Sequence, residues 1–233
     1  MNDKMERKIG IPRRGIYCDS AAADPRLGAA LIVIGALFIS TITVFATTDA
    51  VTIGVDEGEM PPNIVGDARD PVGDWSSFDL YSHFNTSWQE GNSGIWYVIE
   101  FLSTDCGHCW SEAEDMSEMH AHWSPKNVEF IGIAVDFEGN EKFTSTRAEI
   151  AAFQDKSSHS GCYGDSKNCN SRPGSAHNFI YVDDREQTHF NEWGLSGTPS
   201  IFILQPNGLI AWSGPNHPGV ELSEALNSVI PSA

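Results

Sequence analysis

Apolar runs and amphipathic segments alternate through the second half of the chain. Residues 95–102 (IWYVIEFL) and 128–135 (VEFIGIAV) are almost continuously apolar, which is typical of strands buried on both faces of a sheet. Between them, residues 111–123 carry apolar side chains three and four positions apart with acidic residues between, and this spacing predicts an amphipathic helix. Because the connections are short, this order predicts two parallel strands joined by a right-handed crossover.

Shorter elements continue the alternation toward the C-terminus. The turn residues Pro206-Asn207-Gly208 separate two apolar runs and predict a hairpin. Residues 156–176, rich in Ser, Gly and Asn, interrupt the pattern and are expected to form a surface insertion. Residues 75–84 predict a short strand and a turn at the domain edge. The other predicted elements are helices over 147–153, 186–193 and 220–230 and strands over 177–183, 200–204 and 209–212.

An uncharged apolar run lies near the N-terminus. Residues 27–46 (LGAALIVIGALFISTITVFA) would span about 30 Å as a helix, which is the thickness of a bilayer core, so they predict a transmembrane helix. Basic residues outnumber acidic ones in residues 1–26. By the positive-inside rule, we expect this N-terminal segment to be cytoplasmic and the rest of the chain to lie outside a single-pass cell-membrane anchor.

Two alternatives to an anchor remain for this run, a cleaved signal peptide and a buried core helix. The run is longer than the apolar region of a signal peptide, which has about 7 to 15 residues. Both the anchor and the signal peptide place the following domain in an exported compartment that permits disulfides. Residues 47–73, rich in Gly, Pro, Asp and Thr, are expected to be a linker and an entry segment.

Composition and charge narrow the classes of partner. The chain has 233 residues, enough for one domain of ordinary size with appendages, and its 40% hydrophobic and 20% charged residues indicate a globular protein. The formal net charge of -18 argues against nucleic acid as a partner, because the phosphate backbone attracts clustered Lys and Arg.

Two cysteine pairs carry the candidate chemistry. Cys106-Gly-His-Cys109 lies between a predicted buried strand and a predicted helix, and this setting favours a redox dithiol. A zinc site would need two more ligands at matching spacing, so we expect neither a metal nor another cofactor. Cys162 and Cys169 lie in the insertion, where a structural disulfide, a second redox relay pair and two free thiols all remain open.

These motifs, in this order, resemble the thioredoxin superfamily. The chain has a buried strand, Cys-Gly-His-Cys at a helix start, a further strand and helix, and Gly197-Thr198-Pro199 before a terminal hairpin and helix. Met60-Pro-Pro-Asn63 and residues 128–136 (VEFIGIAVD) resemble membrane-anchored thioredoxin-like proteins of cytochrome maturation and extracytoplasmic disulfide exchange. The resemblance implies an α/β thioredoxin-like domain over 74–233, with a central mixed sheet flanked by helices.

The resemblance also implies roles for the motif residues. Cys106 would be the attacking thiol, and its position at a helix N-terminus would lower its pKa. Cys109, one turn later, would resolve the mixed disulfide. Pro199 matches the cis-proline of the family, and Thr198 before it would receive a substrate strand.

Glu100 matches a buried acid of the superfamily beneath the dithiol. Burial would raise the pKa of its carboxyl group and allow it to accept the proton of Cys109, directly or through water. The alternative is that Glu100 points to solvent from a half-exposed strand. Replacing it with Gln would distinguish the two.

Asp105 and His108 set opposing expectations for the redox direction. Asp105 stands where the family usually has an aromatic residue, and its charge should oppose a Cys106 thiolate. His108 resembles the same position of protein disulfide isomerases, and a partly charged imidazole favours the reduced dithiol. The direction stays open, with a lean toward oxidase or isomerase.

The sequence therefore predicts an exported, membrane-anchored thiol–disulfide oxidoreductase that acts on protein cysteines and exchanges electrons with a membrane or exported redox partner. The alternative is a thioredoxin-like copper-binding chaperone, although such proteins usually space their cysteines by three residues. A peroxidase is a weaker interpretation, because nothing near the dithiol resembles the peroxide-binding threonine and cysteine pattern.

Overall fold

The computed structural model describes residues 32–34, 51–137 and 145–231. The chain divides into a unit of residues 1–50 and a unit of residues 51–233, which are considered separately. Residues 32–34 are helical, and the rest of the predicted transmembrane segment 27–46 lies outside the described residues. Within the described ranges, no helix has the length and apolar character needed to cross a membrane.

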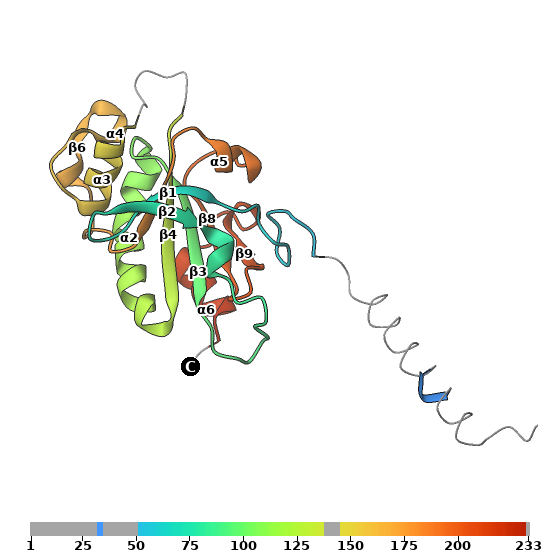
Figure 1. Cartoon of the computed structure of the whole chain (residues 1–233). Helices are drawn as coiled ribbons and strands as arrows, with labels where there is room; N and C mark the ends of the chain where they lie inside the picture. The colour runs from blue at the N-terminus through green and yellow to red at the C-terminus, as the bar shows by residue number, and fades with distance from the viewer. Residues whose placement is uncertain (1–31, 35–50, 138–144, 232–233) are drawn as a thin grey trace, which may run out of the picture. The chain divides into compact units, whose positions relative to one another are not determined.

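A seven-stranded mixed sheet forms the centre of the second unit (Figure 1). Its strand order is β2-β1-β7-β4-β3-β8-β9. The central strands β3, β4 and β7 are parallel, whereas β1, β2, β8 and β9 pair antiparallel with their neighbours. This confirms the predicted mixed sheet. The strands are β1 Val65–Arg69, β2 Trp75–Asp79, β3 Trp96–Leu102, β4 Val128–Val135, β7 Ile180–Asp184, β8 Ser200–Leu204 and β9 Ile210–Ser213.

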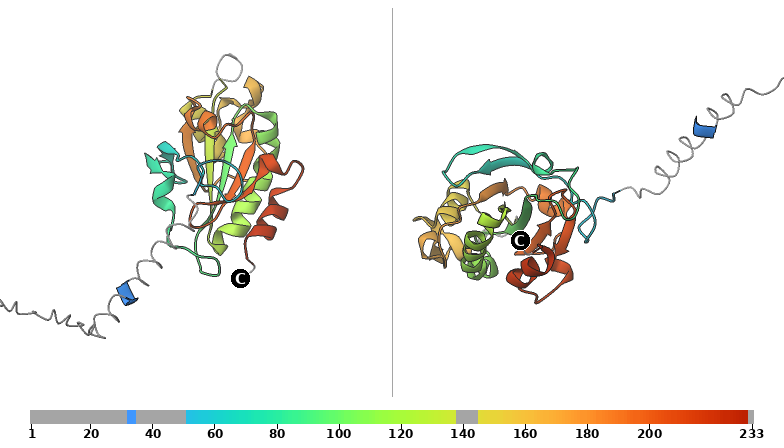
Figure 2. Two further views of the ribbon diagram at one scale, coloured as in Figure 1. Left: turned by 90° about the vertical axis from the view of Figure 1, so that its right-hand side faces the viewer. Right: turned by 90° about the horizontal axis from the view of Figure 1, so that it is seen from below.

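Helices cover both faces of this sheet. Side chains of α2, α3 and α6 pack in one apolar cluster, and Figure 2 shows α2 and α6 on the same side of the sheet. The 3-10 helix η1 and the region of α5 contribute to a second cluster on the other face. These helices are α2 Gly107–Trp123, α3 Arg147–Asp155, α5 Thr188–Glu192, α6 Leu222–Val229 and η1 Leu80–His83.

The central position of strand β3 in the sheet explains why its sequence is continuously apolar. All seven of its residues are buried, and alternate side chains enter opposite clusters because successive residues of a strand face opposite sides. Val98 and Leu102 join the cluster that contains α2, while Ile99 and Phe101 join the other. Glu100 lies between Val98 and Leu102, so its side chain is on the α2 side.

Several element boundaries differ from the sequence predictions, and three of the differences bear on the site or the fold. Strand β1 lies inside the segment expected to be a linker, and only Ala68 and Arg69 of its five residues are buried, which leaves no apolar period to detect. The first turn of α2 consists of the dithiol motif itself, so the helix begins at Gly107 instead of residue 111. The strand predicted over 177–183 is β7, shifted toward the C-terminus.

The entry segment protects the sheet edge at β9. The backbone N–H of Gly58 donates to the carbonyl oxygen of Ile210 at 2.8 Å, and the N–H of Ile210 donates to Glu59 at 2.9 Å. An unpaired edge strand is a template for aggregation. Residues just before β1 therefore belong to the folded unit.

The predicted insertion folds into its own small structure against α3. It contains β5 (Ser160–Gly161), α4 (Cys162–Asp165), β6 (Lys167–Asn168) and the 3-10 helix η3 (Cys169–Ser171). Cys162 and Cys169 form a disulfide and are fully buried. The two residues are therefore not free thiols in this structure, and the choice between a structural staple and a redox relay pair stays a prediction.

Arg172, which follows the disulfide, anchors the insertion to the core. Its side chain is 0% exposed. The guanidinium donates to the carbonyl oxygens of Phe153 at 2.9 Å and Ser175 at 2.6 Å, and it contacts Nε2 of His177 at 2.8 Å. It also donates to the carbonyl oxygen of Ala113 in α2 at 3.3 Å. One side chain therefore joins the insertion, α2 and α3.

We expect Arg172→Met to lower the free energy of unfolding by about 3 kcal/mol, because several buried carbonyl groups lose their donor at once. Arg147→Met is the matched control. Arg147 bonds to Asp67 and Asp183, but its side chain is 45% exposed. Such surface pairs contribute less than about 1 kcal/mol. Urea unfolding of both variants measures the difference, and equal losses would refute the anchoring role.

Candidate functional site

The predicted dithiol lies where β3 ends and α2 begins. Cys106 is the N-cap residue of α2 with extended backbone angles, and Gly107 is the first helical residue. The first turn of a helix presents backbone N–H groups without helical partners, which stabilise negative charge. Cys106 is half-buried, whereas Cys109, one turn further along, is buried. The more accessible thiol is thus the one at the helix end.

The two thiols differ sharply in acidity. The pKa of Cys106 is lowered to about 5, chiefly by a hydrogen bond from the Cys109 side chain, against the opposing effect of burial. The backbone N–H groups of Cys109 and His108 lower it further. Burial raises the pKa of Cys109, and its hydrogen bond to Cys106 and the charge of Glu100 add to this effect. The pair therefore consists of a thiolate and a thiol at neutral pH.

Thr198 and Pro199 lie against the dithiol, as the resemblance implied. The bond between them is cis. The Sγ atom of Cys106 is 3.2 Å from the carbonyl oxygen of Thr198. The Thr198 hydroxyl is buried and has no hydrogen-bond partner among the described residues. A sulfur that approaches Cys106 would meet this loop, but the substrate-binding role of both residues stays a prediction.

Glu100 lies within the core behind the dithiol, which excludes the solvent-facing alternative. The residue is 2% exposed, and its Oε2 atom has no hydrogen-bond partner in the described part of the chain. Burial raises the pKa of its carboxyl group well above the usual range, and the charge of Glu112 adds to this rise. The guanidinium of Arg172 opposes the rise. A carboxyl group so placed suits proton exchange with Cys109.

Asp105 makes a structural contact that the sequence did not predict. Its side chain is buried, and Oδ1 accepts a hydrogen bond of 2.9 Å from the backbone N–H of Gly164 in the insertion. Burial raises the pKa of Asp105 to about 6, with further contributions from Asp165 and Asp136. The carboxyl group thus anchors the insertion, and the predicted opposition of its charge to the Cys106 thiolate stays a prediction.

His108 is exposed in the first turn of α2. Its backbone N–H lowers the pKa of Cys106, and the charge of its imidazole acts on Glu112, four residues further along the helix. The predicted tuning of the dithiol by the imidazole stays a prediction.

The sequence did not single out Glu112, Arg172 or Tyr163 for this site. Burial raises the pKa of Glu112 to about 7, and the charges of Asp115, Glu221 and Cys106 contribute. Its position three residues after Cys109 on a helix could have indicated this proximity. Arg172 and Tyr163 lie more than fifty residues from the motif, and no local pattern connects them with it.

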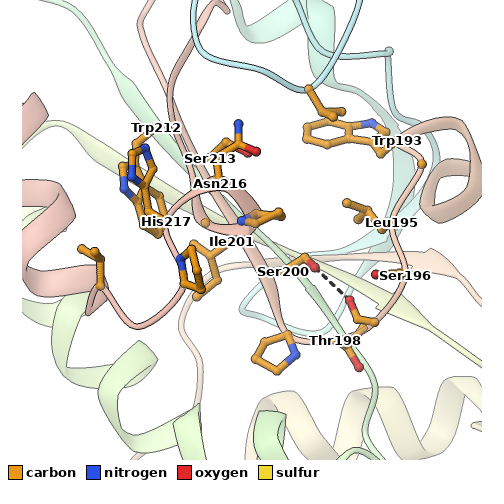
Figure 3. Close-up of a pocket in the computed structure, with 18 of the residues that line it drawn as sticks. Trp193, Leu195, Ser196, Thr198, Ser200, Ile201, Trp212, Ser213, Asn216 and His217 are labelled. Atoms are coloured by element: carbon orange, nitrogen blue, oxygen red, sulfur yellow. Dashed lines mark hydrogen bonds between the residues drawn. The ribbon is translucent and has the colours of Figure 1, made fainter.

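A cavity of about 520 Å³ adjoins the cis-proline loop. Figure 3 shows residues Trp193 to Ser200 along one side of it and Trp212 to His217 along the other. The rings of Trp212 and His217 are stacked with centroids 6.0 Å apart. Nε2 of His217 lies 2.9 Å from Oε1 of Glu57, in the entry segment. The cavity therefore lies next to Pro199, between the cis-proline loop and the segment that follows β9.

The described residues include no group of three or more His, Cys, Asp or Glu side chains arranged to hold a metal ion.

The sequence matches a known family over the region that contains this site. A profile of the AhpC/TSA family matches residues 78–213, which is more than half of the chain. The chain belongs to the AhpC/TSA family. With the mixed sheet, this membership confirms the resemblance to the thioredoxin superfamily and supports an oxidoreductase activity in general. AhpC/TSA membership alone does not specify whether the oxidised substrate is a disulfide or a peroxide.

The chain is also similar to individual known proteins. Protein FixW of Rhizobium leguminosarum is 30% identical over 145 residues, which are 61% of this chain and 56% of FixW. The chain thus spans little more than half of that relative. A reduced 2-Cys peroxiredoxin of Plasmodium vivax has a TM-score of 0.51 at 12% identity over 74% of this chain and 93% of its own, which shows a shared fold. The thioredoxin domain of a Bacteroides vulgatus thiol-disulfide oxidoreductase has a TM-score of 0.49 at 16% identity, over 76% of this chain and 96% of its own.

We expect the rate of Cys106 alkylation by iodoacetamide to rise with pH around a midpoint near 5, because the thiolate is lost as the pH falls through the pKa of the folded state. The measurement uses the reduced full chain with Cys18→Ser. Cys109→Ala should move the midpoint toward the ordinary value of 9, since it removes the strongest stabilising hydrogen bond.

Cys109→Ser is the matched control for that shift. A serine hydroxyl keeps a donor beside Cys106, so its midpoint should stay below that of Cys109→Ala. A midpoint near 9 in the parent protein would contradict the thiolate assignment.

Proposed function

We propose that this protein is an extracytoplasmic thiol–disulfide oxidoreductase that exchanges disulfides with protein cysteines through Cys106 and Cys109. The observation that carries the proposal is the pairing of a half-buried thiolate at the N-terminus of α2 with a buried, protonated thiol three residues later. An attacking group must be ionised and accessible, whereas a resolving group must be held back until a mixed disulfide exists.

The exchange follows from this difference in acidity. The Cys106 thiolate attacks one sulfur of a substrate disulfide, a Cys106–substrate disulfide forms, and the other substrate sulfur leaves as a thiolate. Cys109 then loses its proton and attacks Sγ of Cys106, which releases the second substrate thiolate. The substrate gains two electrons, and the protein retains a Cys106–Cys109 disulfide. The reverse sequence would oxidise a substrate dithiol.

Glu100 is the proposed acceptor for the Cys109 proton. Its charge raises the pKa of Cys109, so the two groups interact electrostatically behind the half-buried Cys106 thiol. Formation of the mixed disulfide removes the negative charge of Cys106, and this lowers the electrostatic cost of a Cys109 thiolate. The same loss of charge favours ionisation of Glu100.

The low pKa of Cys106 supports an oxidising direction. A stabilised thiolate favours the reduced dithiol, so the corresponding disulfide is a stronger oxidant. The backbone N–H donors of the helix end and the Cys109 thiol supply this stabilisation. We therefore propose a disulfide donor or isomerase in preference to a reductase.

The location of the domain is part of the proposal. The uncharged run 27–46 and the excess of basic residues before it favour a membrane anchor with residues 1–26 in the cytoplasm. The buried Cys162–Cys169 disulfide is consistent with an oxidising compartment. A membrane or exported redox partner would then regenerate the dithiol or the disulfide.

We expect the full chain to catalyse insulin reduction by dithiothreitol and refolding of scrambled ribonuclease, and Cys106→Ser to abolish both activities. Cys18→Ser is the matched control, since it removes a cysteine that precedes the apolar run, and it should leave both rates unchanged.

Other outcomes would identify the alternatives to this function. Consumption of hydrogen peroxide that needs Cys106, without protein disulfide exchange, would establish a peroxidase instead. Tight stoichiometric copper binding without either activity would support the copper chaperone.

We expect Glu100→Gln to slow resolution of the mixed disulfide by about 100-fold, the range that a positioned proton acceptor contributes. Wild-type resolution should accelerate as the pH rises through the raised pKa of Glu100, because only the ionised carboxylate accepts a proton. This limb of the pH profile should be lost in the variant. Glu129→Gln, on the neighbouring strand β4 but exposed, is the matched control. An unchanged pH profile in Glu100→Gln would eliminate the proposed role.

A further inference from the structure

We propose that Tyr163 of the insertion forms a substrate-docking surface beside Cys106 and thereby favours polypeptide disulfides over small ones. This inference rests on the proposed function and assigns a residue to its specificity. The Tyr163 ring lies directly over the dithiol motif: a Cβ atom at Gly107 would be 3.2 Å from ring atom Cε2 and 3.4 Å from Oη. Gly107 immediately follows Cys106, so the ring borders the approach to the attacking thiol.

The segment that leads into Cys106 offers a substrate almost no contact surface. Ser103 and Thr104 are fully buried, and Asp105 is nearly so. Tyr163, by contrast, keeps 37% of its surface exposed although one part of its ring contacts Gly107. The insertion therefore supplies an accessible aromatic side chain at a place where the chain next to the motif has none.

The insertion holds Tyr163 in place through several contacts. The backbone N–H of Tyr163 donates to the carbonyl oxygen of Thr104 at 3.1 Å, and the N–H of Gly164 donates to Asp105 at 2.9 Å. The ring packs against Trp110 of α2 with centroids 5.6 Å apart, and Nζ of Lys167 lies 4.4 Å from the Tyr163 ring centroid. The aromatic surface is thus fixed to both ends of the dithiol turn.

The backbone conformation of Tyr163 and the neighbouring Cys162–Cys169 disulfide restrict the ring further. Tyr163 has a φ of 60°, in the left-handed region that bulky residues rarely adopt. Such conformations persist where the surrounding structure determines them, often at functional sites. The preceding residue, Cys162, is bonded to Cys169 and buried. An aromatic side chain held this way loses little conformational entropy on binding, which is what a docking residue needs.

Disulfide exchange brings a substrate close to this ring. The incoming sulfur must come within bonding distance of Cys106, so the residues on either side of a substrate cysteine pass over the dithiol turn. A small disulfide has no such flanking residues. The Thr198 carbonyl contacts Cys106 from another loop, so a polypeptide can touch two surfaces that a small disulfide does not need.

The test compares Tyr163→Asn with Tyr163→Phe in the full chain. Asparagine removes the ring but tolerates the left-handed conformation, which protects the fold of the insertion. Phenylalanine keeps the ring and loses only the hydroxyl. Steady-state reduction of insulin measures the polypeptide reaction, hydroxyethyl disulfide measures the small one, and thermal unfolding reports on the fold.

We expect Tyr163→Asn to raise KM for insulin about tenfold, as loss of an aromatic interface residue does, with kcat and the hydroxyethyl disulfide rate changed less than about twofold. Tyr163→Phe should retain the parent KM. Equal KM values for the parent and Tyr163→Asn, or an equal loss with both disulfides, would overturn the docking role. Absence of Cys106-dependent activity in the parent protein would instead refute the proposed function itself.

Discussion

The hydrogen bond from Cys109 to Cys106 is the interaction on which the chemistry of this site depends. It stabilises a thiolate at the accessible position and simultaneously raises the pKa of its buried donor. The helix end contributes through the N–H groups of His108 and Cys109, but the largest contribution comes from the second sulfur. One contact therefore contributes to the opposite pKa shifts of the two thiols, and it exists because the two cysteines are one helical turn apart.

The groups behind the dithiol are buried, and this burial strengthens the electrostatic interactions that set the pKa values of the two thiols. Glu100 projects from the central strand β3 into the apolar cluster that also contains Cys109, where little solvent screens their charges. Arg172 lies close enough to oppose the raised pKa of Glu100, and it also bonds to the carbonyl oxygen of Ala113 in α2. The charge balance of the core is thereby linked to the disulfide-containing insertion, because Arg172 follows Cys169 by three residues.

Two loops from distant parts of the chain complete the surface around Cys106. The cis-proline loop contributes the carbonyl oxygen of Thr198, 3.2 Å from Sγ, and a cavity adjoins this loop. The insertion contributes Tyr163 above Gly107. Asp105 is the connection between insertion and motif, since its carboxyl group accepts the N–H of Gly164. Asp105 thus has a structural role that its charge alone did not suggest.

The sequence by itself determined the elements whose signals are local. Strands β4 and β8 have the predicted bounds, because an apolar run bounded by polar or turn residues defines a buried strand without further information. The dithiol at a strand-to-helix junction identified Cys106 and Cys109. Glu100 and Pro199 were singled out by the resemblance to a family. Strand β3 is apolar on both faces, so its sequence has no alternation that could show whether Glu100 is buried or exposed.

Only the tertiary structure decided what depends on contacts between distant residues. Strand β1 has no apolar period, since it is stabilised by its pairing with β2 and β7. The sequence left a structural disulfide, a redox relay pair and two free thiols open for Cys162 and Cys169, and folding brings the two sulfurs together in a disulfide. Arg172 and Tyr163 carry no local signal. They lie more than fifty residues from the dithiol motif, and only folding brings them close to it. The pKa values follow the same rule, since burial and neighbouring charges exist only after folding.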